Sequence, residues 1–126
     1  MNDSLFTTLV KVDHIIFKHN TYSSIIHENS SNTIATTDHH NCRMGKWYYE
    51  GEGKQLFSNT SAYKMMEAPH SAVHKLVAQT LECVTRKDCQ SVKSKDSIVQ
   101  NMQLMEQHST ELFSLLEKMV QEANPA

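Results

Sequence analysis

Glycine and proline are scarce in this chain: its 126 residues include three glycines and two prolines. The glycines Gly45, Gly51 and Gly53 fall in one short stretch, so little interrupts a helix elsewhere. A basic excess is also missing, since the net charge is −2, and this argues against a nucleic-acid partner. No apolar run is long enough to cross a membrane as a helix, and the N-terminus lacks the features of a secretory signal peptide. We therefore expect one cytoplasmic domain over 1–126, with no membrane insertion.

Cysteine is limited to three residues, with no C-x-x-C pair. An odd count without such pairs argues against a disulfide framework, and a cytoplasmic chain is expected to keep its thiols reduced. Cys83 and Cys89 fall on or just after a predicted helix, six residues apart. That spacing predicts that they point to different faces, so a joint metal site is not expected there.

Hydrophobic periodicity predicts three long helices, over residues 3–28, 69–87 and 94–121. The polar stretch 29–41 reads as a loop, and 42–67 offers at most short helices. The fold class we expect is all-α, an antiparallel four-helix-type bundle with short extra helices around a buried metal site. The apolar surface of the first helix is broad, so that one half can face the core and the other a partner helix.

The strongest local motif is His70-x-x-x-His74. Residues four apart on a helix lie on the same face, so both imidazoles can reach one ion. The pair also falls on the apolar stripe of its helix, and histidines in a core need either hydrogen-bond partners or a metal. By itself the motif leaves both possibilities open, because H-x-x-x-H arises by chance in a chain with eight histidines.

Two further residues can join this pair. Cys42 opens the segment CRMGKW, where Gly45 and Trp47 indicate a specific local packing, and His14 lies between Val10 and Phe17 on a core-facing stripe. A lone cysteine is more often a small buried hydrophobe, and a lone histidine is more often hydrogen-bonded in a core. Taken together, however, three imidazoles and a thiolate suit tetrahedral Zn²⁺ in a closed site.

The order of His14, then Cys42-Arg-Met-Gly-Lys-Trp47, then the H-x-x-x-H pair resembles the chemoreceptor zinc-binding domain. The resemblance extends over about 5–85, with the last helix consistent in length and pattern. It implies a helical bundle in which His14, Cys42, His70 and His74 hold a buried Zn²⁺. It also implies a homodimer and a regulatory role toward an attached bacterial signalling domain, of the chemotaxis-receptor or cyclic-di-GMP type. Such a domain is not an enzyme, and the chain is then either a standalone version or an excised C-terminal piece of a receptor.

The mixed ligand set suggests a mechanism, in which the Cys42 thiolate is the exchangeable ligand because it lies on the least regular backbone. Its protonation, oxidation or release would change the local fold around the glycines and bias helix packing. Metal-bound histidines usually donate their other N–H to an oxygen atom. The nearby carboxylates in the sequence are Asp13, Asp38 and Glu67.

Three other interpretations compete with this one. A di-iron, oxygen-binding bundle of the hemerythrin kind needs bridging carboxylates at fixed offsets from its histidines, and no H-x-x-x-E occurs. A zinc hydrolase is disfavoured by the fourth ligand and by the absence of an H-E-x-x-H glutamate. A metal-free helical dimerisation module would explain the helical stripes but not the surroundings of Cys42.

His39 and His40 fall in the polar loop, where we expect them to be solvated, although either can serve as an alternative ligand.

Overall fold

The structure is a computed structural model that describes residues 3–28 and 38–123. Within these residues the chain forms six helices in the order α1 (Asp3–His27), α2 (Arg43–Tyr49), α3 (Glu52–Phe57), α4 (Ser61–Met65), α5 (Glu67–Arg86) and α6 (Val92–Ala123). The all-α prediction is confirmed. The three long helices begin and end within about two residues of the predicted bounds, whereas most of the predicted loop lies outside the described residues.

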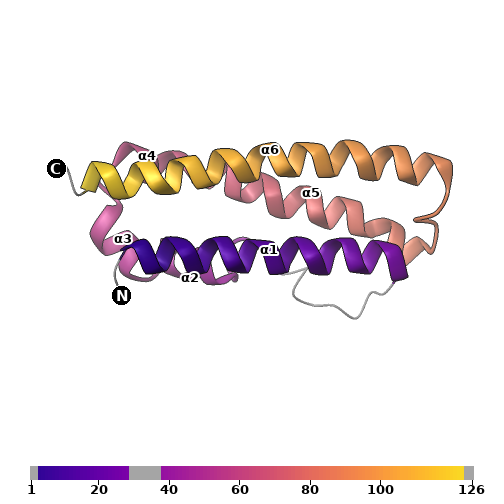
Figure 1. Ribbon diagram of the computed structural model, residues 1–126, viewed down its shortest axis with the longest axis horizontal. Helices are drawn as coiled ribbons and strands as arrows, with labels where there is room; N and C mark the ends of the chain where they lie inside the picture. Colours follow the sequence, from indigo (N-terminus) through magenta and orange to yellow (C-terminus); the bar gives the residue numbers. More distant parts are fainter. Residues whose placement is uncertain (1–2, 29–37, 124–126) are drawn as a thin grey trace.

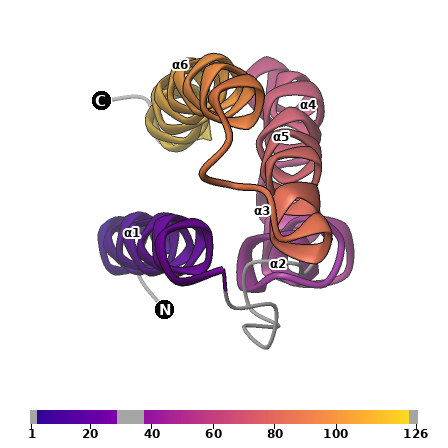
Figure 2. The same cartoon turned by 90° about the vertical axis from the view of Figure 1, so that its right-hand side faces the viewer.

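The long helices run along a common axis (Figure 1). Helix α6 is antiparallel to both α1 and α5, and the short helices α2, α3 and α4 lie toward the end that carries both chain termini. Seen end-on, α1 and α6 occupy two corners, while α5 and the short helices occupy the opposite side (Figure 2). The short helices thus stand where a regular bundle would have a fourth long helix. None of the described helices is both long enough and apolar enough to cross a membrane.

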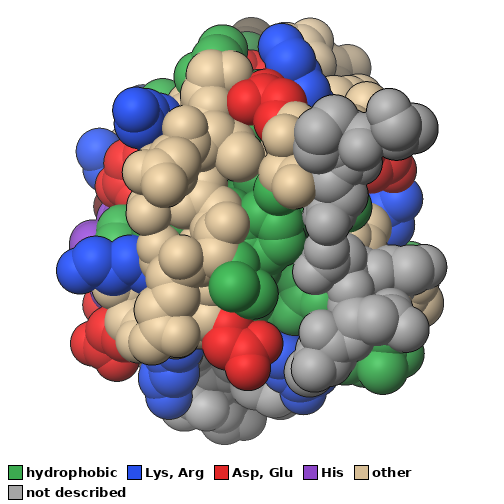
Figure 3. Space-filling view, turned by 90° about the vertical axis from the view of Figure 1, so that its left-hand side faces the viewer, with side chains coloured by type: hydrophobic (Ala, Val, Ile, Leu, Met, Phe, Trp, Pro, Cys, Tyr) green, Lys and Arg blue, Asp and Glu red, His purple; other side chains and the backbone are tan. Residues whose placement is uncertain are grey.

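Two hydrophobic clusters fill the interior. The cluster nearer the chain termini includes Phe6 and Val10 of α1, Met66, and Leu112 and Leu116 of α6. Viewed from that end, apolar side chains are also seen at the surface, at the centre of the face (Figure 3). The second cluster lies further along the long helices, and its members are Phe17, Ile25, Val73, Val77, Leu81, Cys83, Val84, Cys89, Met102 and Met105.

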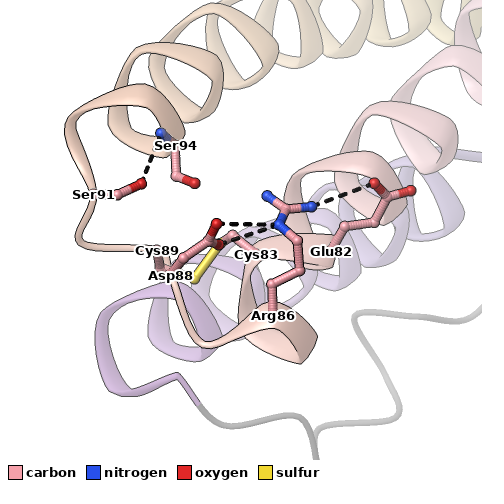
Figure 4. The surroundings of a disulfide bond; sticks show 7 residues. All are labelled: Glu82, Cys83, Arg86, Asp88, Cys89, Ser91 and Ser94. Carbon is pink, nitrogen blue, oxygen red and sulfur yellow. Dashed lines mark hydrogen bonds and ion pairs between the residues drawn. A yellow bond between two sulfur atoms is a disulfide. The ribbon is translucent and has the colours of Figure 1, made fainter.

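The predictions that Cys83 and Cys89 face apart and that the thiols stay reduced were wrong for this pair, because the structure joins them in a disulfide with their Cα atoms 4.9 Å apart (Figure 4). The cause is the end of α5. Lys87 adopts a left-handed conformation with φ 58°, and the amide of Asp88 donates to the carbonyl oxygen of Cys83. This hydrogen bond is typical of a Schellman turn, which reverses the chain direction. Cys89 therefore lies outside the helix, where helical spacing no longer decides which way a side chain points.

Candidate metal centre

A polar layer separates the two hydrophobic clusters. On α1, His14 lies between Val10 of one cluster and Phe17 of the other. On α5, His70 takes the same intermediate place after Met66 and before Val73, and it is only 4% exposed. On α6, the buried Ser109 lies between Met105 and Leu112. Each of the three long helices thus contributes a polar side chain at the same level of the bundle, where an apolar residue would otherwise continue the core.

Cys42, His70 and His74 come together within this layer. One potential ligand atom from each residue lies within 4.8 Å of the others. The two histidines extend from successive turns of α5, with their ring centroids 5.1 Å apart, as the i, i+4 spacing predicts. The Sγ atom of Cys42 lies 3.3 Å from Nε2 of His70.

These distances suit a zinc ion. Zinc bonds of about 2.0–2.1 Å to nitrogen and 2.3 Å to sulfur, at a tetrahedral angle, place N and S about 3.5 Å apart. The observed 3.3 Å between the Cys42 sulfur and the His70 nitrogen is close to that value. Imidazole and thiol groups also bind zinc in preference to magnesium or calcium, which favour oxygen ligands. The donor set and its spacing therefore fit the ion that the sequence predicted.

Cys42 is positioned by the start of α2. It is the N-cap residue of that helix, and its sulfur accepts a hydrogen bond from the amide of Gly45 at 3.3 Å. The same sulfur donates to the carbonyl oxygen of His39 at 3.6 Å. A Cβ atom at position 45 would lie 1.9 Å from that His39 oxygen, so only glycine allows the backbone to approach this closely.

Trp47 connects this segment to α1. Its ring stacks on Phe6 with centroids 3.9 Å apart, and it also packs against Phe57. Gly53 leaves room for the ring, because a Cβ there would lie 2.5 Å from it. Helix α2, whose N-cap is Cys42, is thus in direct contact with the N-terminal part of α1.

His14 does not join the group of three, but its imidazole lines the same pocket. Its Nε2 atom lies 2.6 Å from the hydroxyl oxygen of Ser109, and its ring meets Phe113 edge-on with centroids 5.0 Å apart. The pocket has a volume of about 380 Å³ and is lined by residues of α1, α2, α5 and α6, including Cys42, His70 and His74. His14 therefore lies beside the three-residue group with its Nε2 already hydrogen-bonded.

Burial sets the protonation of these groups. It lowers the pKa of His70 to about 3, with a further contribution from the neighbouring His74 and His39. Burial likewise lowers the pKa of His14 to about 4, helped by the positive charge of Lys18. Burial raises the pKa of the Cys42 thiol. Both of these histidines are consequently neutral at pH 7, the form that binds a metal, whereas the thiol must lose a proton to do so.

The three carboxylates named from the sequence take different positions. Asp13 lines the pocket and forms an ion pair with Arg43 at 3.1 Å. Asp38 is exposed and accepts a hydrogen bond from the amide of His40. Glu67 contacts Nε2 of His39 at 3.1 Å. Among the described residues that line the pocket, Asp13 is the only carboxylate, and this does not supply the bridging carboxylates of a di-iron centre.

Ser109, the hydrogen-bond partner of His14, is a residue whose role sequence analysis did not identify. Its hydroxyl interrupts the apolar stripe of α6 between Met105 and Leu112, and that interruption was the available signal. The expectation that His39 is solvated also differs from the structure. Its side chain is 16% exposed and packs near the rings of His70 and His74.

Comparison with known protein families gives a match. The profile of the family described as chemoreceptor zinc-binding domain matches residues 14–81. These residues include His14, Cys42, His70 and His74, and they make up more than half of the chain. No curated protein and no solved structure matches. On the strength of this profile, the chain belongs to the chemoreceptor zinc-binding domain family.

Proposed function

We propose that this chain is a regulatory domain that binds one Zn²⁺ through Cys42, His70 and His74, with His14 as the fourth ligand. The observation that carries the proposal is the convergence of the first three ligand atoms within 4.8 Å, inside a pocket that His14 also lines. His14 completes the three-imidazole, one-thiolate set typical of closed zinc sites. Bound zinc would supply a cross-link between helices, since the four ligands come from α1, the start of α2, and α5.

The thiolate is the ligand best placed to report a signal. Cys42 is both a ligand candidate and the cap of α2, so displacement of its sulfur by protonation or oxidation would remove a zinc bond and alter the helix start. Helix α2 then contacts α1 through the stacked rings of Trp47 and Phe6. A change at the sulfur thereby reaches α1, whose exposed apolar surface carries more large hydrophobic side chains than that of any other described helix.

That surface supports a homodimer. Helix α1 exposes large apolar side chains at positions spaced by three, four and seven residues, which places them on one face. These residues are Leu5, Val12, Ile15, Ile16, Tyr22 and Ile26, of which Ile15 is 61% and Ile26 67% exposed. Pairing of two such faces would bury them. The dimer would transmit the state of the zinc site to an attached signalling domain of the bacterial chemotaxis-receptor or cyclic-di-GMP type, in the cytoplasm.

The metal content of the purified protein tests this function. Elemental mass spectrometry is expected to find about one zinc per chain, and clearly less in Cys42→Ala and His74→Ala. His19→Ala, which removes an exposed histidine of α1, is the matched control and should keep its zinc. Iron at about two per chain would instead support a di-iron bundle. A folded protein without metal would leave a metal-free dimerisation module and contradict the ligand assignment.

The fourth ligand needs a separate variant. His14→Ala should retain some zinc through the other three ligands but bind it more weakly, by about tenfold or more. Competition with a chromophoric chelator measures that affinity. Unchanged affinity in His14→Ala would show that His14 is not a ligand, while leaving the three-residue group intact.

A further inference from the structure

A second cluster of potential ligands lies outside the pocket. His39, His40 and Glu67 each offer one ligand atom within 4.8 Å of the others. Nε2 of His39 lies 3.1 Å from a carboxylate oxygen of Glu67, and the two histidine rings have centroids 4.2 Å apart. His40 is exposed, whereas His39 is largely covered. The cluster thus opens to solvent on one side and faces the protein on the other.

The backbone holds this cluster in a defined shape. The carboxylate of Asp38 accepts hydrogen bonds from the amides of His40 and Asn41, which fixes the turn that carries both histidines. Gly45 packs directly against the carbonyl group of His39. Glu67 lies in the first turn of α5 and contacts His39 of the turn through its carboxylate. Three ligands on two separate segments are therefore presented together without a rearrangement of the chain.

Two polar atoms at this cluster lack partners. The Oε2 atom of Glu67 is buried and has no hydrogen-bond partner among the described residues, although the side chain as a whole is 46% exposed. The ring of Tyr49 packs with its centroid 4.3 Å from that of His40. Its hydroxyl is also buried and has no hydrogen-bond partner among the described residues. A buried carboxylate oxygen without a donor is costly, and a cation would offset that cost.

We propose that His39, His40 and Glu67 form a second, outer zinc site. Two imidazoles and one carboxylate are the protein ligands of open zinc sites, in which water takes the fourth position. Because it has three protein ligands and one exposed face, the outer site binds zinc more weakly and releases it faster than the pocket does.

The outer site is also placed to supply the pocket. His39 belongs to the outer cluster but also lies near the pocket ligands. Its ring centroid is 5.5 Å from that of His70 and 6.3 Å from that of His74. The Cys42 sulfur contacts the carbonyl oxygen of the same residue, His39. A cation bound at the outer site would therefore lie close to the ligands of the pocket. This supply role rests on the function proposed above, whereas the existence of the outer site does not.

Titration of the zinc-free protein with Co²⁺ tests the site. Binding at the pocket produces a near-ultraviolet thiolate-to-cobalt band through Cys42, and binding at the outer site adds visible absorption without that band. The wild type is expected to bind about two Co²⁺ per chain, and only the first should carry the thiolate band. His40→Ala and Glu67→Gln should lose the second equivalent and keep the first, whereas Cys42→Ala should lose the band and keep the second. The matched control His19→Ala should bind both.

The outcomes separate the two proposals. A wild type that binds a single Co²⁺ with the thiolate band, or a His40→Ala variant that still binds two, overturns the outer site. A wild type without the thiolate band contradicts the pocket instead. Stopped-flow measurement of the band tests the supply role: His40→Ala should load the pocket several-fold more slowly than the wild type and His19→Ala. Equal loading rates overturn that role.

Discussion

The Nε2 atom of His14 lies 2.6 Å from the hydroxyl oxygen of Ser109, 95 positions away along the chain. This contact links α1 to α6 inside the polar layer. The other ring nitrogen of His14, Nδ1, has no hydrogen bond to the described residues. A metal-bound histidine is typically oriented by an oxygen atom at its other nitrogen. Ser109 is therefore in the position of an orienting partner for the proposed fourth ligand.

Ser109→Ala tests this orienting role. Loss of the hydroxyl should lower zinc affinity by about tenfold while leaving the metal content at saturating zinc unchanged, because the ligands remain. Chelator competition measures the affinity, and Ser114→Ala, at an exposed serine of the same helix, is the control. An affinity that rises in Ser109→Ala would show that the hydroxyl competes with zinc for Nε2.

Gly45→Ala should disrupt the Cys42 segment. The added methyl group meets backbone atoms of His39 and His40, which cannot rotate away as a flexible side chain can. We expect a free energy of unfolding lower by about 2 kcal/mol and zinc affinity reduced at least tenfold. Gly51→Ala is the matched control, because its Cβ would meet nothing closer than 3.1 Å. Thermal unfolding and chelator competition measure the two effects, and equal behaviour of the two variants would contradict the role of Gly45.

Zinc affinity should depend on pH through Cys42. Burial raises the pKa of this thiol from 9.0, so it is protonated at pH 7 and each binding event releases its proton. His14 and His70, with pKa values of about 4 and 3, have no proton to lose in that range. The association constant should consequently rise about tenfold per pH unit between about pH 7 and 8.5. In Cys42→Ala the remaining affinity should vary much less, and an equally steep rise there would assign the released proton to another group.

Reduction of the Cys83–Cys89 disulfide should destabilise the protein without affecting zinc. The bond closes a loop of about seven residues at the α5–α6 turn, and opening such a loop costs about 2 kcal/mol of unfolding free energy. Chemical denaturation with and without a phosphine reductant measures this difference. The double variant Cys83→Ala/Cys89→Ala should show no response to the reductant. A response in that variant would place the sensitivity at Cys42.

The exposed face of α1 should govern self-association. Ile15→Glu, at a side chain that is 61% exposed, would introduce a charge at the proposed dimer surface and shift the protein to a monomer in analytical ultracentrifugation. Val92→Glu is the matched control, since Val92 is 80% exposed at the start of α6. A wild type that is monomeric at micromolar concentration would contradict the dimer itself.

The long helices were predictable because their apolar residues repeat with helical spacing over many turns. The same regularity explains why His70 and His74 could be paired from sequence, as residues four apart share a face wherever the helix packs. Cys42 had no such periodicity, and its place in the ligand set was inferred from the nearby Gly45 and Trp47 and then from the resemblance to a family. The structure then supplied the reason for the nearby glycine, which is the close approach of Gly45 to the His39 carbonyl group.

What the sequence could not provide were contacts made where periodicity ends. The Cys83–Cys89 bond depends on the left-handed conformation of Lys87, a residue type that gives no signal for such a turn. The approach of His39 to Glu67 joins a turn to a helix start across 28 positions. Ser109 lay in a predictable stripe, but its partner His14 is on another helix, and only the relative placement of α1 and α6 brings them together.

The polar layer has a consequence for cooperativity. Because it divides the apolar interior, we expect each hydrophobic cluster to lose its packing without first exposing the other, so that the two halves of the bundle open locally as separate units. Cations bound at the layer would join these units, so that amide hydrogens on both sides exchange through the same opening event. Metal occupancy would then set how far a disturbance at one end of the bundle spreads toward the other.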